Sequence, residues 1–284
     1  MTDIIELDEA PSLGALYAKA ALPAGGGDGS LPETRLVRRG VSLDRDHVAA
    51  YARVCGFTLT DALPPTYLHM LAFPLQIQLM SGKDFPFPLL GMVHLRQRID
   101  IARPVTADEV VDLIVWLEEL RPHAKGRQFT VRSQASVGDV VVWDGSSTYL
   151  HRGKDSGESA SESHPADAVG VADLPMTATW RVEADQGRRY GKVSGDVNPI
   201  HLSALTAKPF GFPTAIAHGM WTMARSLAAL EGRIPDHASI DVAFKTPLLL
   251  PSTVTFASQE VGGGWQFGVR DRSGKPHLAG VVTG

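Results

Sequence analysis

Residues 190–201 read YGKVSGDVNPIH, and this stretch sets the interpretation of the whole chain. Asp196 and His201 stand five positions apart with Asn198-Pro199 between them. Pro199 disfavours a helical conformation at Asn198, so we expect the chain to turn out of the preceding helix here. A carboxylate and an imidazole on such a turn can converge, hold a water molecule and transfer protons near neutral pH. The stretch therefore predicts an acid–base site.

The residues around this pair have expected roles of their own. Asn198 either orients the pair or caps a turn, because its amide both donates and accepts hydrogen bonds. Ser194 is expected to support the loop, since no base stands at a spacing that would make it a nucleophile. Ala217-His218-Gly219-Met220 opens a helix over about 220–230 that is apolar on nearly every side and must be buried. The backbone N–H of Gly219 is then a good donor to an oxygen that gains negative charge.

The two halves of the chain resemble each other. Residues 44–57, DRDHVAAYARVCGF, align without gaps with residues 183–196, EADQGRRYGKVSGD. Two further blocks follow at nearly the same offset. One is a Pro-Thr segment followed by His and an apolar stretch, and the other is a Pro-containing segment before a strand. Three blocks in one order predict a duplicated domain. The first half has Cys55 and Phe57 in place of Ser194 and Asp196, so only the second half keeps the chemistry.

A Ser-, Gly- and acid-rich segment marks the expected boundary. We predict a first repeat over 1–150 with a loosely ordered lead over 1–32, a linker over 151–174, and a second repeat over 175–284. In each repeat a strand leads to a short helix capped by Asp46 or Asp185, and the buried helix follows. Alternating β-rich runs come next, at 110–117, 128–137, 140–150, 240–244, 253–261, 265–271 and 277–282. This order predicts an α+β fold in which an antiparallel sheet wraps a helix.

Composition excludes several classes of protein. The 284 residues carry 31 acidic and 27 basic side chains, so no basic surface for nucleic acid is expected. The single cysteine rules out a disulfide framework, and the scattered histidines predict no metal site. No G-x-G-x-x-G is present, so no redox cofactor is expected. With no membrane-length apolar run and no signal peptide, the expected location is the cytoplasm.

The quoted motifs resemble the signature of the MaoC-like hydratases, (R)-specific enoyl-thioester hydratases and dehydratases. The match runs from Tyr190 through His201 and includes the later Ala-His-Gly-Met. The resemblance implies a double hotdog fold, two repeats that each wrap a sheet round a central helix. It also implies that Asp196 and His201 activate the water that adds to the double bond, and that the Gly219 N–H polarises the thioester carbonyl.

The expected activity is hydration and dehydration between trans-2-enoyl and (R)-3-hydroxyacyl thioesters, without a cofactor. The thioester is carried by coenzyme A or by acyl carrier protein, and the chain acts as a monomeric pseudo-dimer or a homodimer. The first half would then supply the acyl-chain pocket. Two alternatives stay open: a hotdog thioesterase, and a non-catalytic subunit that binds acyl thioesters.

Overall fold

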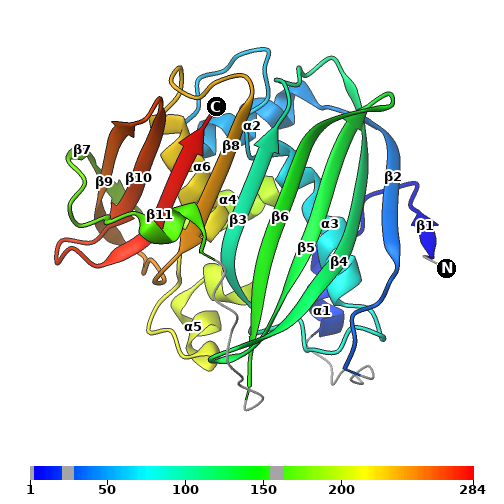
Figure 1. Cartoon of the computed structure of the whole chain (residues 1–284). Helices are drawn as coiled ribbons and strands as arrows, with labels where there is room; N and C mark the ends of the chain where they lie inside the picture. Colours follow the sequence, from blue (N-terminus) through cyan, green and yellow to red (C-terminus); the bar gives the residue numbers. More distant parts are fainter. Residues whose placement is uncertain (1–2, 21–28, 154–162) are drawn as a thin grey trace. The chain divides into compact units, whose positions relative to one another are not determined.

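The computed structural model describes residues 3–20, 29–153 and 163–284, which form two compact units (Figure 1). Both units are assembled from separated segments of the chain. Unit 1 contains Met1–Leu43, Leu68–Gln97 and Asp108–Glu162, and unit 2 contains Asp44–Tyr67, Arg98–Ala107 and Ser163–Gly284. Unit 2 thus includes two segments from the predicted first repeat. The division into repeats at 1–150 and 175–284 stays a prediction.

Unit 1 is a sheet with one long helix, α3 (Tyr67–Met80). Its strands are, in order, β1 (Ile4–Glu6), β2 (Arg35–Ser42), β4 (Val110–His123), β5 (Gly126–Val137), β6 (Val140–Arg152) and β3 (Val93–Ile101), of which the residues from Arg98 onward belong to unit 2. The pairs β2–β4, β4–β5 and β5–β6 are antiparallel, whereas β1 joins in parallel. Gln76 ties the helix to the sheet, because its Nε2 donates to Ser133 Oγ at 3.0 Å and its Oε1 accepts from the Tyr149 hydroxyl at 3.3 Å.

The expected loosely ordered lead is partly regular. Residues 4–6 form β1, and α1 (Leu13–Ala20) follows. Leu13 and Tyr17 are buried, which anchors that helix. The Gly-rich part of the lead over 21–28 lies outside the described residues.

Unit 2 is a five-stranded antiparallel sheet packed against helix α6 (Gly219–Ala229). Its strands are, in order, β8 (Ala238–Phe244), β11 (Pro276–Thr283), β10 (Gly264–Arg270), β9 (Ser252–Val261) and β7 (Met176–Val182). Two further helices, α2 (Arg45–Cys55) and α4 (Gln186–Ser194), pack on each other. Short turns follow α4: η2 (Pro199–His201), α5 (Ala204–Ala207) and η3 (Lys208–Phe210). No helix of the described residues is long and apolar enough to span a membrane.

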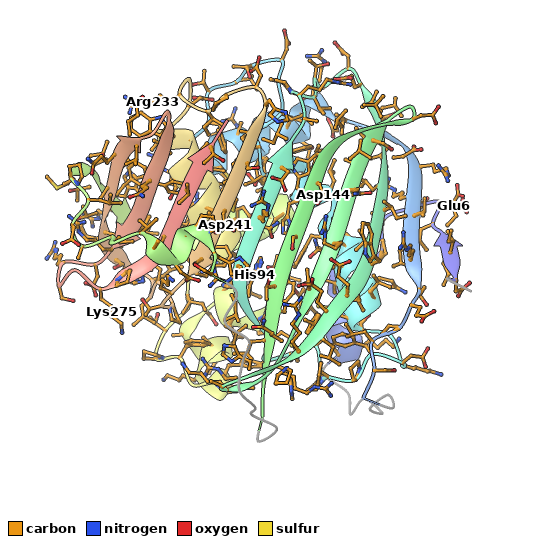
Figure 2. All side chains as sticks on the ribbon, viewed as in Figure 1. Glu6, His94, Asp144, Arg233, Asp241 and Lys275 are labelled. Atoms are coloured by element: carbon orange, nitrogen blue, oxygen red, sulfur yellow. The ribbon has the colours of Figure 1, made fainter. Side chains whose placement is uncertain are left out.

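The end of the predicted linker is not loose. Residues 165–168 form a 3₁₀ turn, η1, and Val169, Val171 and Leu174 are buried against the sheet of unit 2. Asp241 on β8, labelled in Figure 2, accepts a hydrogen bond from the Ala166 N–H at 3.0 Å. These contacts explain why a segment rich in small and polar residues is held in place. Residues 154–162 of the predicted linker lie outside the described residues.

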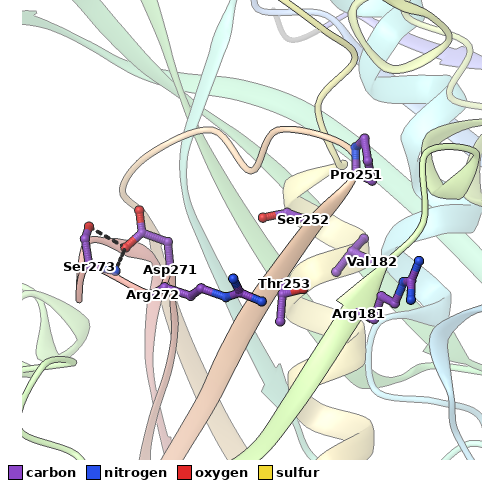
Figure 3. Close-up of a pocket in the computed structure, with 8 residues that line it drawn as sticks. All are labelled: Arg181, Val182, Pro251, Ser252, Thr253, Asp271, Arg272 and Ser273. Atoms are coloured by element: carbon purple, nitrogen blue, oxygen red, sulfur yellow. Dashed lines mark hydrogen bonds between the residues drawn. The ribbon is translucent and has the colours of Figure 1, made fainter.

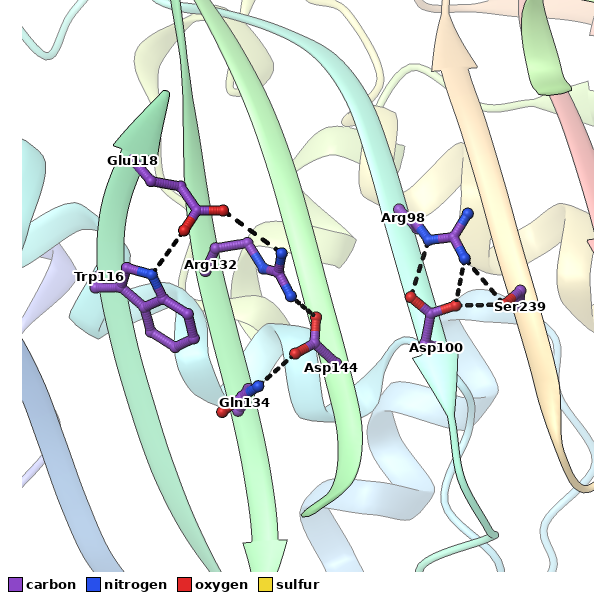
Figure 4. A network of polar contacts seen from close by, with 8 residues as sticks. All are labelled: Arg98, Asp100, Trp116, Glu118, Arg132, Gln134, Asp144 and Ser239. Carbon is purple, nitrogen blue, oxygen red and sulfur yellow. Dashed lines mark hydrogen bonds and ion pairs between the residues drawn. The ribbon is translucent and has the colours of Figure 1, made fainter. Parts of the chain in front are cut away.

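The sheets carry polar networks on the face that alternates with the core residues (Figure 4). In unit 1, Arg132 pairs with Glu118 at 3.5 Å and with Asp144 at 2.5 Å. In unit 2, Arg98 pairs with Asp100 at 2.8 Å. The period of two that predicted β4, β5 and β6 therefore separates a polar face from a buried one.

Candidate active site

The acid–base pair lies on the turn that follows α4. That helix ends at Ser194, and Gly195 adopts a left-handed conformation with φ of 73°. The Gly195 N–H closes the helix on Gly191 O, and the chain then turns away. Pro199 begins the next turn, η2, and the Asn198 side chain caps it by accepting from Ile200 N at 3.4 Å. The chain thus leaves the helix where the sequence predicted, and Asn198 caps a turn.

Local hydrogen bonds hold Asp196 in place. The Ser194 hydroxyl donates to Tyr190 O at 2.9 Å and accepts from Asp196 N at 3.2 Å. Asp196 Oδ1 in turn accepts from Asn198 N at 3.2 Å. Ser194 therefore links the end of α4 to Asp196, and the carboxylate has one oxygen engaged by its own turn; that Ser194 serves as a supporting residue stays a prediction.

His201 is oriented by a backbone carbonyl. Its Nδ1 lies 2.8 Å from Ile216 O, and because a carbonyl only accepts, Nδ1 carries the proton. The Nε2 atom of the neutral ring then holds a lone pair. Burial lowers the pKa of His201, and the nearby Asp196 carboxylate opposes that shift. His201 is thus a neutral imidazole at pH 7, with one basic nitrogen.

A third side chain, His218, joins the pair. Its Nε2 lies 3.0 Å from Asp196 O and 3.7 Å from Asp196 Oδ2. Its ring stacks on that of His201 with centroids 3.6 Å apart. Burial, and then the neighbouring His201, lower the pKa of His218 to about 3. The sequence favoured a structural helix-start residue over a general base for His218, and its contacts with Asp196 and His201 were not predicted.

Asp196, His201 and His218 are also the group that a metal ion would use, since one ligand atom of each lies within 4.8 Å of the others. The hydrogen bonds argue against that use. The His218 nitrogen nearest Asp196 is the one that donates to a carbonyl, so it has no lone pair to give. In this arrangement His218 Nε2 is therefore a hydrogen-bond donor and not a metal ligand. That no metal is needed stays a prediction.

Gly219 is the first residue of α6, directly after His218. A β carbon at this position would lie 3.0 Å from two ring atoms of Phe244, so the close approach of that ring favours glycine. The first N–H groups of a helix have no acceptor within the helix and lie at the positive end of its dipole. The predicted donor N–H thus begins a helix whose preceding residue contacts both Asp196 and His201.

Two glycines of α4 allow the turn that carries Asp196 and His201 to lie close to this helix. A β carbon on Gly187 would lie 2.0 Å from His201 O, and one on Gly191 would lie 2.9 Å from Asp196 O. Sequence reasoning missed both. Their spacing of four residues within a helix places them on one face, and that spacing is the signal that could have revealed them.

A helix from the first half of the chain supports α4. His47 on α2 lies 2.8 Å from Val193 O through Nε2 and 2.8 Å from the Tyr67 hydroxyl through Nδ1. The carbonyl fixes the proton on Nε2, so Tyr67 donates to Nδ1. The Tyr51 and Tyr190 rings, which the repeat alignment pairs, lie 6.1 Å apart. The first half therefore contributes to the surroundings of the site through α2.

Unit 2 also carries an open depression of about 580 Å³ (Figure 3). It lies at the ends of β7 and β9 and is lined by Arg181, Val182, Pro251, Ser252, Thr253, Asp271, Arg272 and Ser273. None of the predicted site residues is among these eight. The depression is therefore separate from the acid–base pair.

Comparison with known proteins places these features in a family context. The family model described as "MaoC like domain" matches residues 163–275. The 3-hydroxyacyl-thioester dehydratase X of Mycobacterium tuberculosis is 37% identical over 268 residues, which cover 94% of this chain and 95% of that protein.

Solved structures agree with that sequence match. A crystal structure of HtdX from Mycobacterium tuberculosis superposes with a TM-score of 0.78 at 36% identity, covering 88% of this chain and 99% of the other. A MaoC-like dehydratase from Phytophthora capsici gives a TM-score of 0.71 at 20% identity, covering 88% and 94%, a likeness of fold alone. The predicted fold class, an α+β hotdog architecture, is confirmed.

Proposed function

Because the chain belongs to the family of MaoC-like dehydratases, we propose that it interconverts trans-2-enoyl and (R)-3-hydroxyacyl thioesters by adding or removing water. The observation that carries this proposal is the pair formed by the half-buried Asp196 and the buried His201, in which a carboxylate lies near a neutral imidazole with a free lone pair. Such a pair can take a proton from water and return one to carbon.

In the hydration direction, Asp196 and His201 Nε2 accept hydrogen bonds from one water molecule. The pair takes a proton from this water as its oxygen bonds to C3. The electrons of the double bond move toward C2 and the thioester oxygen, and the Gly219 N–H stabilises the negative charge there. The pair then gives the proton to C2. Dehydration follows the same steps in reverse, with removal of the C2 proton and departure of the C3 hydroxyl as water.

The test follows the absorbance of crotonyl-coenzyme A, with longer enoyl chains and acyl-carrier-protein thioesters next. Wild type should consume the enoyl group without releasing thiol, and Asp196→Asn should lose at least about 10²-fold in rate. Asp185→Asn is the matched control, the same change on a carboxylate at the start of α4. Thiol release would replace the proposal by a thioesterase. A folded protein that turns over no enoyl thioester would indicate a binding subunit.

The carrier and the assembly are also proposals. We infer that the acyl group arrives on coenzyme A or on acyl carrier protein, in the cytoplasm. The chain would act as a monomer containing two hotdog repeats, or as a homodimer. Measuring the mass in solution against the chain mass of 30.5 kDa separates these two states.

A further inference from the structure

We propose that His218 is a positioning residue for the acid–base pair: its Nε2–H holds Asp196, and its ring shields His201 from water. This inference rests on the proposed function, because it assigns His218 a task in that same reaction. His218 is placed to touch both partners rather than the reacting atoms, so it acts through Asp196 and His201.

His218 holds Asp196 through its Nε2–H group. The Asp196 carbonyl accepts from His218 Nε2 at 3.0 Å, which fixes the proton on that nitrogen. The same nitrogen lies 3.7 Å from Asp196 Oδ2, which is too long for a hydrogen bond but keeps the N–H dipole near the carboxylate. The hydrogen bond therefore restrains the backbone of Asp196, from a residue 22 positions away along the chain.

The ring of His218 also covers His201. The two imidazole rings stack with centroids 3.6 Å apart and an angle of 25° between their planes. The ring of Tyr190 on α4 lies 4.9 Å from His218. His218 is only 3% exposed, so it covers His201 with a dry surface. That cover contributes to the burial that keeps His201 neutral.

The proposed role requires His218 to stay uncharged. The ionisable groups that face it are Asp196 on the turn, His201 on η2 and Tyr190 on α4. A cation at this position would pair with the Asp196 carboxylate and weaken it as a base. Burial and the adjacent His201 disfavour that charge.

The contacts of His218 also argue against selection for stability alone. Its Nδ1 atom is buried and has no hydrogen-bond partner in the part of the chain that the structure describes. An unpaired buried acceptor destabilises a fold. An apolar side chain would avoid that cost, so stability alone does not account for an imidazole at this position.

The experiment separates the two halves with two variants of the full chain. His218→Phe keeps an aromatic cover and removes the N–H, whereas His218→Gln keeps an N–H and removes the ring. NMR titration of the His201 imidazole, assigned through His201→Gln, is measured beside the pH dependence of hydration. We expect at least a tenfold lower rate in the Phe variant with an unchanged His201 midpoint. In the Gln variant, we expect a rate within tenfold of wild type above its acidic limb, and a midpoint that moves up toward 6.5.

Each readout can overturn one half of the proposal. An unchanged rate in the Phe variant overturns the holding role, and an unchanged His201 midpoint in the Gln variant overturns the shielding role. A loss of thermal stability without either change would leave His218 as a packing residue only.

A measurement on the wild type keeps the proposal testable if the variants fail to fold. There the His218 ring should stay neutral down to about pH 4, and a ring that titrates near 6.5 overturns the proposal. Because the NMR titrations need no turnover, they remain readable even if the wild type hydrates no thioester and the proposed function fails.

Discussion

Replacing Gly187 with alanine should move the backbone of His201 and slow hydration while the protein stays folded. The new β carbon would lie 2.0 Å from His201 O, whereas ordinary contact begins near 3.4 Å, so the two must separate by roughly 1.4 Å. Both are backbone-linked and cannot swing away as a flexible side chain would. A displacement of about 1 Å in a catalytic group costs about 10²-fold in rate.

The effect on stability should be smaller. Overpacking costs about 1–3 kcal/mol, and the preference of a helix for alanine over glycine returns about 1 kcal/mol. We therefore expect a net loss of up to about 2 kcal/mol in the free energy of unfolding.

Enoyl-thioester absorbance and urea unfolding measure the two quantities on the same preparations. The matched control is Gly14→Ala, which makes the same change at the second residue of α1, where nothing lies within 4 Å of the added carbon. The control should keep full activity and lose no stability. A Gly187→Ala enzyme that hydrates within threefold of wild type would refute the argument that Gly187 allows this close approach.

Three further predictions concern ionisation and capping. Hydration needs neutral His201, whose pKa burial lowers, so the rate should fall with decreasing pH at a midpoint below 6.5; a midpoint at or above 6.5 would contradict this. Burial raises the pKa of Cys55 to about 12, so a thiol reagent at pH 8 should label it only after denaturant is added; rapid labelling of the native protein would show the opposite. Asp44 caps α2, so Asp44→Ala should cost about 1 kcal/mol in urea unfolding, whereas Asp185→Ala, which removes no side-chain cap bond, should cost less; equal losses would count against the cap.

Much of the fold was predictable because its strands bury one face. The alternating runs predicted at 110–117, 128–137 and 140–150 lie within β4, β5 and β6. Strand β3 was not predicted, although its sequence, VHLRQRIDI, alternates apolar with polar or charged residues at every position except Gln97, the period of two that is typical of a strand.

Helix starts were predicted less well. The expected cap of the first helix was Asp46, but Asp44 accepts the N–H bonds of Asp46 and His47. Its homologous position in the second half holds Glu183, and there the helix begins after Asp185. The choice between two candidate caps two positions apart depends on which side chain reaches the free N–H groups, and the repeat alignment does not show this.

The site was predictable where its chemistry is local in sequence. Asp196 and His201 share one turn, and a proline revealed that turn. His218 was recognised only as a helix start, because its contact with Asp196 arises from the tertiary fold. Gly187 was missed because its close approach to His201 O arises from the packing of η2 on α4, which the sequence does not show.

The placement of α2 has a consequence for how such a chain can change over generations. The half that lacks the acid–base pair still provides His47, which donates to Val193 next to the catalytic turn. If the halves arose by duplication, the first half lost the acid–base residues but stayed under selection. Its loss would remove the support that α2 gives to α4 in the second half. Within the first half, substitutions should therefore be tolerated least along α2. A gene that encodes the second half alone should not replace the full-length gene.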